Sequence, residues 1–334
     1  MARWILVFLI FSAFWALPGR TQVQEPTVEF SVAVNLVKVP ISVFDESGNL
    51  ITSLRIEDFR IWEDQEEQEI RSFGLDTNPV SVVLLLDTSS SSGAELKKIK
   101  QAAESFAAEL SPEDRICLIT FDDQVNRILD WTNDLRKVRR ALAKIEPGLR
   151  TALYDAMFVA AQEQLRGIEG RKAIILLTDC LNNQSSMGFQ DAAIAIVQSQ
   201  AALYVVSKTA MVREQAKKDR RVMMLTDIYR RLFGGDDNYI DEFFRKREEE
   251  MVELAEKTGG RCFFPPDYAL IKNVYAEVAK ELKSKYYLTY VSNQKLSPNS
   301  YHRITIQYLA PAGKILYRKG YYHEPRPLHR APQR

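Results

Sequence analysis

The stretch "SVVLLLDTSSSSG", residues 81–93, joins an apolar run directly to a carboxylate and a row of hydroxyl groups. The five apolar residues 82–86 have the length and composition that are typical of a strand buried on both faces. Asp87, Ser89 and Ser91 follow in the spacing D-x-S-x-S. On its own, this spacing is typical both of a serine-rich loop and of half of an oxygen-ligand metal site.

Strand and helix patterns alternate along the chain from Pro79 onward. The segments "RICLITF" (115–121), "KAIILLTD" (172–179) and "ALYVVSK" (202–208) are predicted strands, and residues 93–110 are the first of several predicted amphipathic helices. Short apolar strands separated by helices predict an α/β fold with a doubly wound, mostly parallel sheet that is covered on both faces. Ligands of such sheets bind at the carboxyl ends of the strands.

Both ends of the chain carry strand patterns without helices. Residues 28–77 and 284–322 each alternate apolar and polar residues, but the first of these has too few strands for an independent sandwich. We therefore expect one small β-sandwich-like domain built from both ends, with the α/β domain of residues 80–283 inserted. Within it, residues 210–248 are highly charged and predict a helical insertion, either a solvated excursion or a partner-binding surface. Residues 323–334 are predicted to be a flexible tail.

The first 20 residues have the layout of a secretory signal peptide. Arg3 precedes an apolar run from Trp4 to Leu17, and Pro18 and Gly19 then interrupt the run. The run is shorter than a comfortable membrane span. We therefore expect export to the periplasm, the cell envelope or the exterior, with no membrane span in the mature chain. An uncleaved anchor is the alternative.

Charge and histidine content argue against two classes of function. The 45 basic and 44 acidic residues give a net charge of +1, which disfavours a broad nucleic-acid surface. The three histidines, His302, His323 and His329, all lie beyond the α/β domain, so Ser89 lacks a base for a Ser-His-Asp arrangement. The motifs H-E-x-x-H, G-x-S-x-G and G-x-x-x-x-G-K-[ST] do not occur. We expect a binding protein and not an enzyme.

Two polar positions far along the chain favour the metal-site interpretation. Thr151 directly precedes a predicted helix, and Asp179 ends the second long apolar strand. Two aspartates at strand ends, with hydroxyl groups nearby, suit a small hard cation such as Mg²⁺, with Mn²⁺ or Ca²⁺ as alternatives. The candidate metal ligands are Asp87, Ser89, Ser91, Thr151 and Asp179.

This set of segments resembles the von Willebrand factor type A (VWA) domain with its metal ion-dependent adhesion site (MIDAS). The resemblance covers residues 80–283. It implies that Ser89, Ser91 and Thr151 offer hydroxyl groups to the metal, while the two aspartates bind it directly or through water. It also implies the partner, a protein ligand that presents an acidic side chain, whose carboxylate completes the metal coordination.

The whole chain also resembles a VWFA-related family of exported proteins found in Acidobacteria. The run "DFRIWEDQEEQEIRSF" (58–73) matches that family, except that Gln65 stands where glycine is usual. Cys180 stands where glycine usually follows the second aspartate, either as a tolerated substitution or as a redox-sensitive or metal-binding thiol. Asp155, one helical turn after Thr151, either accepts hydrogen bonds near the site or lies on the helix surface.

These observations support two hypotheses. The leading one is an exported adhesion protein that captures a protein ligand through the metal of its VWA domain. The alternative is a structural envelope or assembly protein with a vestigial metal site, which binds partners through residues 210–248 or through its β domain. The sequence specifies no oligomeric state.

Overall fold

The computed structural model describes residues 35–89, 96–218, 239–294, 297–310 and 313–328, all within one compact unit that spans residues 35–334. The predicted signal peptide (1–20), Ser91, the middle of the predicted insertion and the end of the predicted tail lie outside these ranges. Within the described ranges, no helix is long and apolar enough to cross a membrane.

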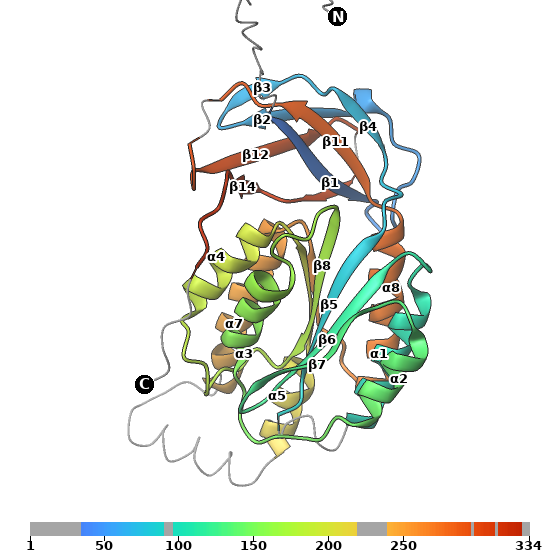
Figure 1. Cartoon of the computed structure of the whole chain (residues 1–334), viewed down its shortest axis with the longest axis vertical. Helices are drawn as coiled ribbons and strands as arrows, with labels where there is room; N and C mark the ends of the chain where they lie inside the picture. The colour runs from blue at the N-terminus through green and yellow to red at the C-terminus, as the bar shows by residue number, and fades with distance from the viewer. Residues whose placement is uncertain (1–34, 90–95, 219–238, 295–296, 311–312, 329–334) are drawn as a thin grey trace, which may run out of the picture. The chain divides into compact units, whose positions relative to one another are not determined.

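A six-stranded sheet forms the middle of the α/β part, in the order β10-β9-β8-β5-β6-β7 (Figure 1). Neighbouring strands are parallel, except that the edge strand β7 runs antiparallel to β6. The central strands are buried almost throughout, as strands covered on both faces must be. The strands are β5 (Val80–Asp87), β6 (Arg115–Phe121), β7 (Val125–Thr132), β8 (Arg171–Thr178), β9 (Ala202–Ser207) and β10 (Arg261–Phe263).

Helices cover both faces of this sheet (Figure 1). Alternate side chains of β5 point to opposite faces, so Val82 and Leu84 pack against α1, α2 and α8, whereas Val83 and Leu85 pack against α3, α4 and α7. The prediction of a doubly wound, mostly parallel sheet is therefore confirmed. The helices are α1 (Leu96–Glu109), α2 (Leu135–Ala143), α3 (Leu153–Phe158), α4 (Phe189–Ser199), α7 (Tyr239–Lys257) and α8 (Ile271–Lys283).

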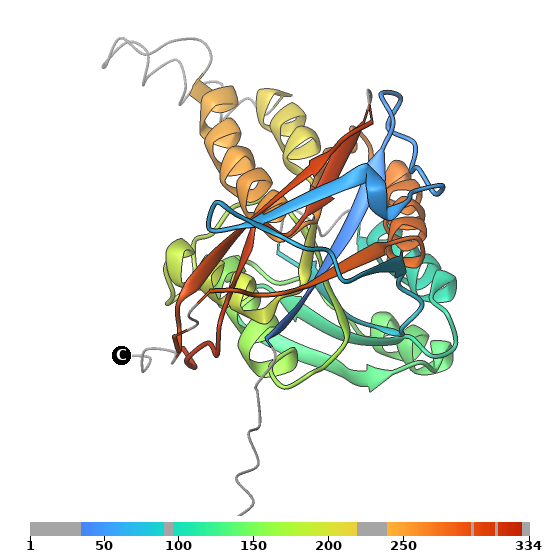
Figure 2. The same cartoon turned by 90° about the horizontal axis from the view of Figure 1, so that it is seen from above.

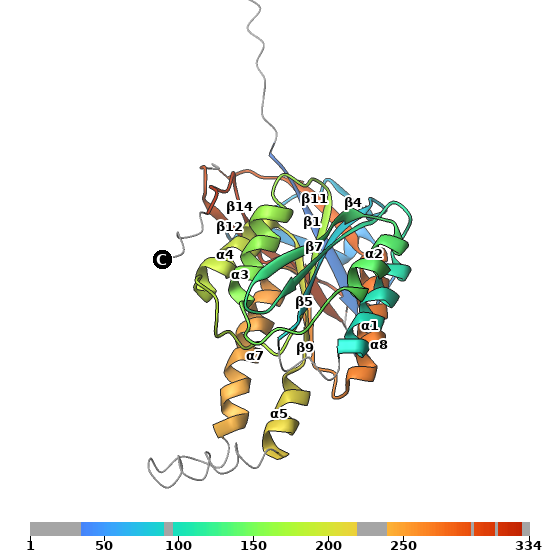
Figure 3. The ribbon, with the colours of Figure 1, turned by 60° about the horizontal axis from the view of Figure 1, so that its bottom comes forward.

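The described parts of the predicted insertion are helical. Helix α5 (Thr209–Lys218) begins two residues after β9 ends, and α7 supplies the other described part. The two helices contact one another and project beyond the end of the sheet (Figures 1 and 3).

Two antiparallel four-stranded sheets combine strands from both ends of the chain, in the orders β13-β1-β11-β4 and β14-β12-β2-β3. Figure 2 shows the blue N-terminal strands interleaved with the red C-terminal strands. Apolar side chains from both sheets, such as Ile41, Ile61, Leu288 and Ile304, form one core between them. The predicted β-sandwich-like element built from both ends is thus present. Its strands are β1 (Leu36–Phe44), β2 (Phe59–Glu63), β3 (Glu66–Gln68), β4 (Ser72–Leu75), β11 (Tyr286–Val291), β12 (Tyr301–Tyr308), β13 (Lys314–Tyr317) and β14 (Gly320–Tyr322).

Candidate functional site

Three neighbouring parallel strands end side by side at one edge of the central sheet. Strand β5 ends at Asp87, β8 is followed by Asp179, and β9 is followed by Lys208. The pairing of β5 with β8 and of β8 with β9 keeps these ends level. This carboxyl edge lies on the side of the sheet away from the antiparallel sheets (Figures 1 and 3). Side chains from three distant parts of the sequence therefore share one small region.

Both carboxylate oxygens of Asp87 have donors from the chain itself. The Oδ1 atom accepts a hydrogen bond from the backbone N–H of Ser89 at 3.0 Å. The Oδ2 atom accepts one from the backbone N–H of Asp179 at 3.4 Å and lies 3.1 Å from Nζ of Lys208. The Asp87 and Lys208 side chains are fully buried. The structure thus brings Asp87, Ser89 and Asp179 together, and it adds a lysine.

Lys208 is held at this edge by its backbone and by charge. Its N–H donates a 2.7 Å hydrogen bond to the carbonyl oxygen of Thr178. Burial lowers the pKa of the Lys208 ammonium, but the charges of Asp87 and Asp179 outweigh burial and raise that pKa above its ordinary value. The two carboxylates thus favour the protonated form of the side chain, which places a positive charge beside Asp87.

Hydrogen bonds hold the loop that carries Thr151 at the same edge of the sheet. Gly148 donates its N–H to the carbonyl oxygen of Thr88 at 2.8 Å, and Thr151 donates its N–H to Oδ1 of Asn183 at 2.8 Å. A Cβ atom at Gly148 would lie 2.3 Å from Cβ of Asp122, so only glycine fits this approach. Thr151 is buried beside these contacts, whereas Ser91 lies outside the described residues.

Asp155 is buried and bonded to a neighbouring loop, so it does not lie on an exposed helix surface. Its carboxylate accepts hydrogen bonds from the backbone N–H groups of Ser186, at 3.2 Å, and Met187, at 3.0 Å. The hydroxyl of Ser186 also donates to it at 3.0 Å. Asp155 thus anchors the loop that follows Asp179 to helix α3.

Cys180 is buried and has a left-handed backbone, with φ of +61°. A left-handed φ is easiest for glycine, which accounts for glycine being usual at this position. Burial raises the pKa of the Cys180 thiol to about 12. Its Sγ lies 3.7 Å from Oγ of Ser207, within the protein interior. A thiol with this pKa is protonated near neutral pH and is a poor nucleophile or metal ligand.

The described residues of this edge, which do not include Ser91, do not fit a divalent metal. Both oxygens of Asp87 already face donors, and one of those donors is a buried ammonium 3.1 Å away. A divalent ion bound to Asp87 would lie directly beside that like charge.

Lys208 was not among the residues predicted from the sequence. The sequence shows only that a lysine ends the strand segment "ALYVVSK", at the end where ligands of parallel sheets bind. The positions of Asp87 and Asp179 predict oxygen ligands for a bound ion, and they do not indicate a cation that the chain itself supplies.

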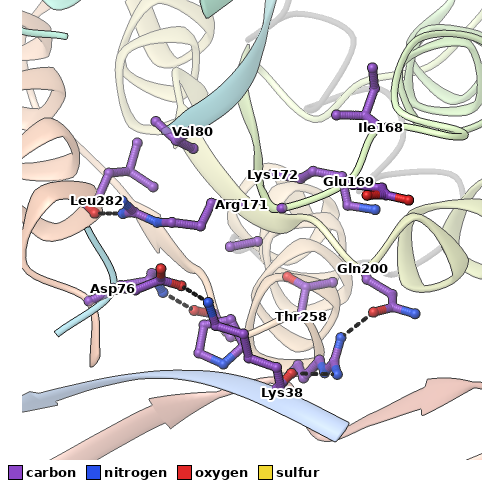
Figure 4. Close-up of a pocket in the computed structure, with 16 residues that line it drawn as sticks. Lys38, Asp76, Val80, Ile168, Glu169, Arg171, Lys172, Gln200, Thr258 and Leu282 are labelled. Carbon is purple, nitrogen blue, oxygen red and sulfur yellow. Dashed lines mark hydrogen bonds and ion pairs between the residues drawn. The ribbon is translucent and has the colours of Figure 1, made fainter. Parts of the chain in front are cut away.

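A second candidate site is a cavity of about 370 Å³ at the opposite edge of the sheet (Figure 4). Val80 and Arg171, the first residues of β5 and β8, line it together with residues of the antiparallel sheets. Lys38 and Asp76 form an ion pair of 2.8 Å in its wall. Its charged lining is mostly basic, comprising Lys38, Arg171, Lys172, Lys285 and Arg318 against Asp76 and Glu169.

Comparison with known families assigns the segment that contains the first site. Residues 82–182 match the family model described as von Willebrand factor type A domain. The matched segment includes Asp87, Thr151 and Asp179 but not Lys208, and it does not reach the antiparallel sheets. The resemblance of the whole chain to an exported family of Acidobacteria therefore stays a prediction. No curated protein matches the sequence significantly.

Solved structures with a similar arrangement come from several organisms. BatB from Bacteroides thetaiotaomicron is 19% identical, with 61% of this chain and 99% of that chain covered and a TM-score of 0.42. The vWF domain of the type V pili tip protein Mfa5 from Porphyromonas gingivalis is 25% identical, with 34% and 44% covered and a TM-score of 0.31. Proximal thread matrix protein 1 from the mussel byssus, with a zinc-occupied MIDAS motif, is 13% identical, with 67% and 50% covered and a TM-score of 0.47. This chain thus spans half or less of the Mfa5 and byssus structures.

Proposed function

The chain contains a von Willebrand factor type A domain at residues 82–182, and from this we propose that the protein is an exported binding protein that captures a protein ligand. The binding surface is the carboxyl edge of the central sheet, around the loop that carries Thr151. The predicted signal peptide supports export. The absence of a histidine base near Ser89 in the sequence supports a binding role in place of catalysis.

The observation that carries this proposal is the position of Leu149. Its side chain is 77% exposed, the highest value among the large apolar side chains of the described residues. Its backbone is nevertheless braced, since its N–H donates a 3.1 Å hydrogen bond to Oδ2 of Asp123. The next residue, Arg150, donates to Oε1 of Gln184 at 2.7 Å. We infer that the exposed side chain of Leu149, held on a hydrogen-bonded loop beside Arg150, forms the contact point for the partner, since arginine is enriched among the residues that dominate binding energy.

The test is a pull-down from envelope extract with three immobilised proteins. The wild-type protein and Leu309→Asp, a control at an exposed position of the β part, should retain the same partner band. Leu149→Asp should lose the band, because a charge replaces the apolar anchor. Equal retention by all three proteins would refute the proposal and would favour binding through residues 210–248 or through the β domain.

A further inference from the structure

We propose that Lys208 is the resident cation of this VWA site and takes the place of a divalent metal. The ammonium group of the chain, and not a bound ion, would then compensate the carboxylates at the carboxyl edge. This inference concerns the cation alone, and it holds whether or not the ligand is a protein.

The order of the strands places the lysine over the site. Strand β8 lies between β9 and β5, so Lys208 leaves β9 two strands away from Asp87. Adjacent strands lie about 4.8 Å apart, so the side chain must extend across the end of β8 to reach its partner. The distance of 3.1 Å between Nζ and Oδ2 shows that it does so. The lysine therefore covers the region between the two aspartates.

Burial makes this cation necessary. Asp87 and Asp179 are both buried, and burying a carboxylate is costly unless it is both paired with an opposite charge and hydrogen-bonded. Backbone N–H groups donate to both oxygens of Asp87, from Ser89 and from Asp179, and the N–H of Leu181 donates to Oδ1 of Asp179 at 3.1 Å, but these neutral donors leave the negative charge of the carboxylates in place. The remaining negative charge needs a cation, and the buried ammonium of Lys208 provides one.

A divalent metal would have to displace that ammonium. Mg²⁺ binds oxygen ligands at about 2.1 Å, so an ion on Oδ2 of Asp87 would lie beside Nζ of Lys208. The backbone of Lys208 is fixed by its hydrogen bond to Thr178, and its side chain has no exposed surface. Leaving the site would therefore require a rearrangement of the packed edge. Retaining the lysine and excluding the metal is the simpler outcome.

This assignment changes the chemistry of ligand capture. A metal-bearing site offers an open coordination position to an acidic side chain, but Lys208 is fully buried and cannot offer one. A partner would instead contact the surface groups of the edge, including Leu149 and Arg150. Partner binding should consequently be insensitive to EDTA.

The test compares metal binding by the wild-type protein with that of Lys208→Met. Binding of Mn²⁺ is measured by electron paramagnetic resonance, and the Tm is measured in EDTA and in millimolar Mg²⁺ or Mn²⁺. The wild-type protein should show no bound Mn²⁺ and the same Tm in all three solutions. Lys208→Met should have a lower Tm in EDTA and should bind Mn²⁺, with a rise in Tm because the metal binds only the folded state.

Two controls separate this result from general effects of losing a buried lysine. Lys285→Met removes another buried lysine, which pairs with Glu281 at 3.3 Å far from the site, and it should gain no metal binding. The double variant Asp87→Asn with Lys208→Met should lose the metal binding that the single variant gains. Lys208→Gln, which keeps a polar side chain, replaces Lys208→Met if that variant does not fold.

Two results would overturn the proposal. Binding of Mn²⁺ by the wild-type protein as tight as that of the Lys208 variant would show that the lysine does not exclude the metal. A folded Lys208→Met or Lys208→Gln protein without metal binding would show that the lysine does not stand in for a metal. If neither variant folds, binding of Mn²⁺ by the wild-type protein would by itself overturn the proposal.

Discussion

The hydroxyl of Tyr204 on β9 donates a 2.7 Å hydrogen bond to Oε1 of Glu281 on α8, and both side chains are buried. The same carboxylate lies 3.3 Å from Nζ of Lys285 and accepts a 3.2 Å hydrogen bond from Nε of Arg261. It also accepts a 3.3 Å hydrogen bond from the hydroxyl of Ser42 on β1. The buried carboxylate of Glu281 on the last helix therefore forms hydrogen bonds with both the central sheet and the antiparallel sheets.

We expect Glu281→Ala to destabilise the protein by about 3–5 kcal/mol, because it leaves the buried ammonium of Lys285 without its carboxylate. Tyr204→Phe should reduce the free energy of unfolding by about 1.5–3 kcal/mol, since it removes a single hydrogen bond to a charged group. Urea denaturation of both variants measures these values. Equal losses for the two substitutions would show that Glu281 acts only through Tyr204.

The turn between β2 and β3 should be improved by glycine. Glu63 pairs with Glu66, so Asp64 and Gln65 form a two-residue loop, and both have positive φ, +47° and +76°. This is the pattern of a type I′ turn, in which glycine is strongly preferred. Gln65→Gly should raise the free energy of unfolding by about 1 kcal/mol by relieving left-handed strain. Gln65→Ala is the control and should show no such gain.

The fold could be predicted because strands that are buried on both faces are apolar throughout, and this pattern can be recognised in a short stretch of sequence. Residues 82–86 and 173–177 are wholly apolar, which indicates neighbouring strands of a covered parallel sheet. Asp87 directly follows the first run, and Asp179 follows the second after Thr178. The carboxyl ends of parallel strands meet at one edge, so the proximity of the two aspartates could also be predicted. The pairing register of β1 with β11, in contrast, joins residues 245 to 255 positions apart, and no local pattern specifies it.

The role of Lys208 could not be predicted in the same way. A lysine after a strand is ordinary, and its reach to Asp87 depends on the sheet order β9-β8-β5. Sheet order is set by how the helices pack between distant segments, and not by residues near the lysine. The burial of Asp155 is a further case, since its partners Ser186 and Met187 belong to a loop whose path the sequence did not indicate.

The three cysteines should be unreactive in the folded protein. Burial raises the pKa of Cys117 and of Cys180 to about 12, and it raises the pKa of Cys262 as well. Because the thiolate is the reactive form, a thiol-specific chromophoric reagent at pH 8 should label no cysteine in native protein and three after unfolding in urea. Rapid labelling of one thiol in the native protein would contradict this prediction. Loss of that labelling in Cys180→Ser would then identify the reactive thiol as Cys180, the residue after Asp179.

The basic cavity should make stability depend on pH in the alkaline range. Burial, together with the nearby charge of Arg318, lowers the pKa of Lys172 from 10.5 to about 8. Between pH 8 and pH 10.5, the unfolded chain therefore binds more protons than the folded protein. The charged Lys172 side chain destabilises the folded protein fully below pH 8, and this destabilisation disappears as the pH rises toward 10.5. The full shift corresponds to about 3 kcal/mol, and partial solvent screening reduces our expectation to about 1–2 kcal/mol.

Lys172→Met should consequently have a higher Tm than the wild-type protein at pH 7, by about 2–6 °C for a chain of this size. The difference should shrink steadily between pH 8 and pH 10.5, because the wild-type lysine loses its charge over that range. Lys144→Met, at an exposed position of the same chain, is the matched control and should follow the wild-type curve. A Tm difference that stays constant across this range would show that the charge of Lys172 does not limit stability, and that the variant gains only from added apolar contact.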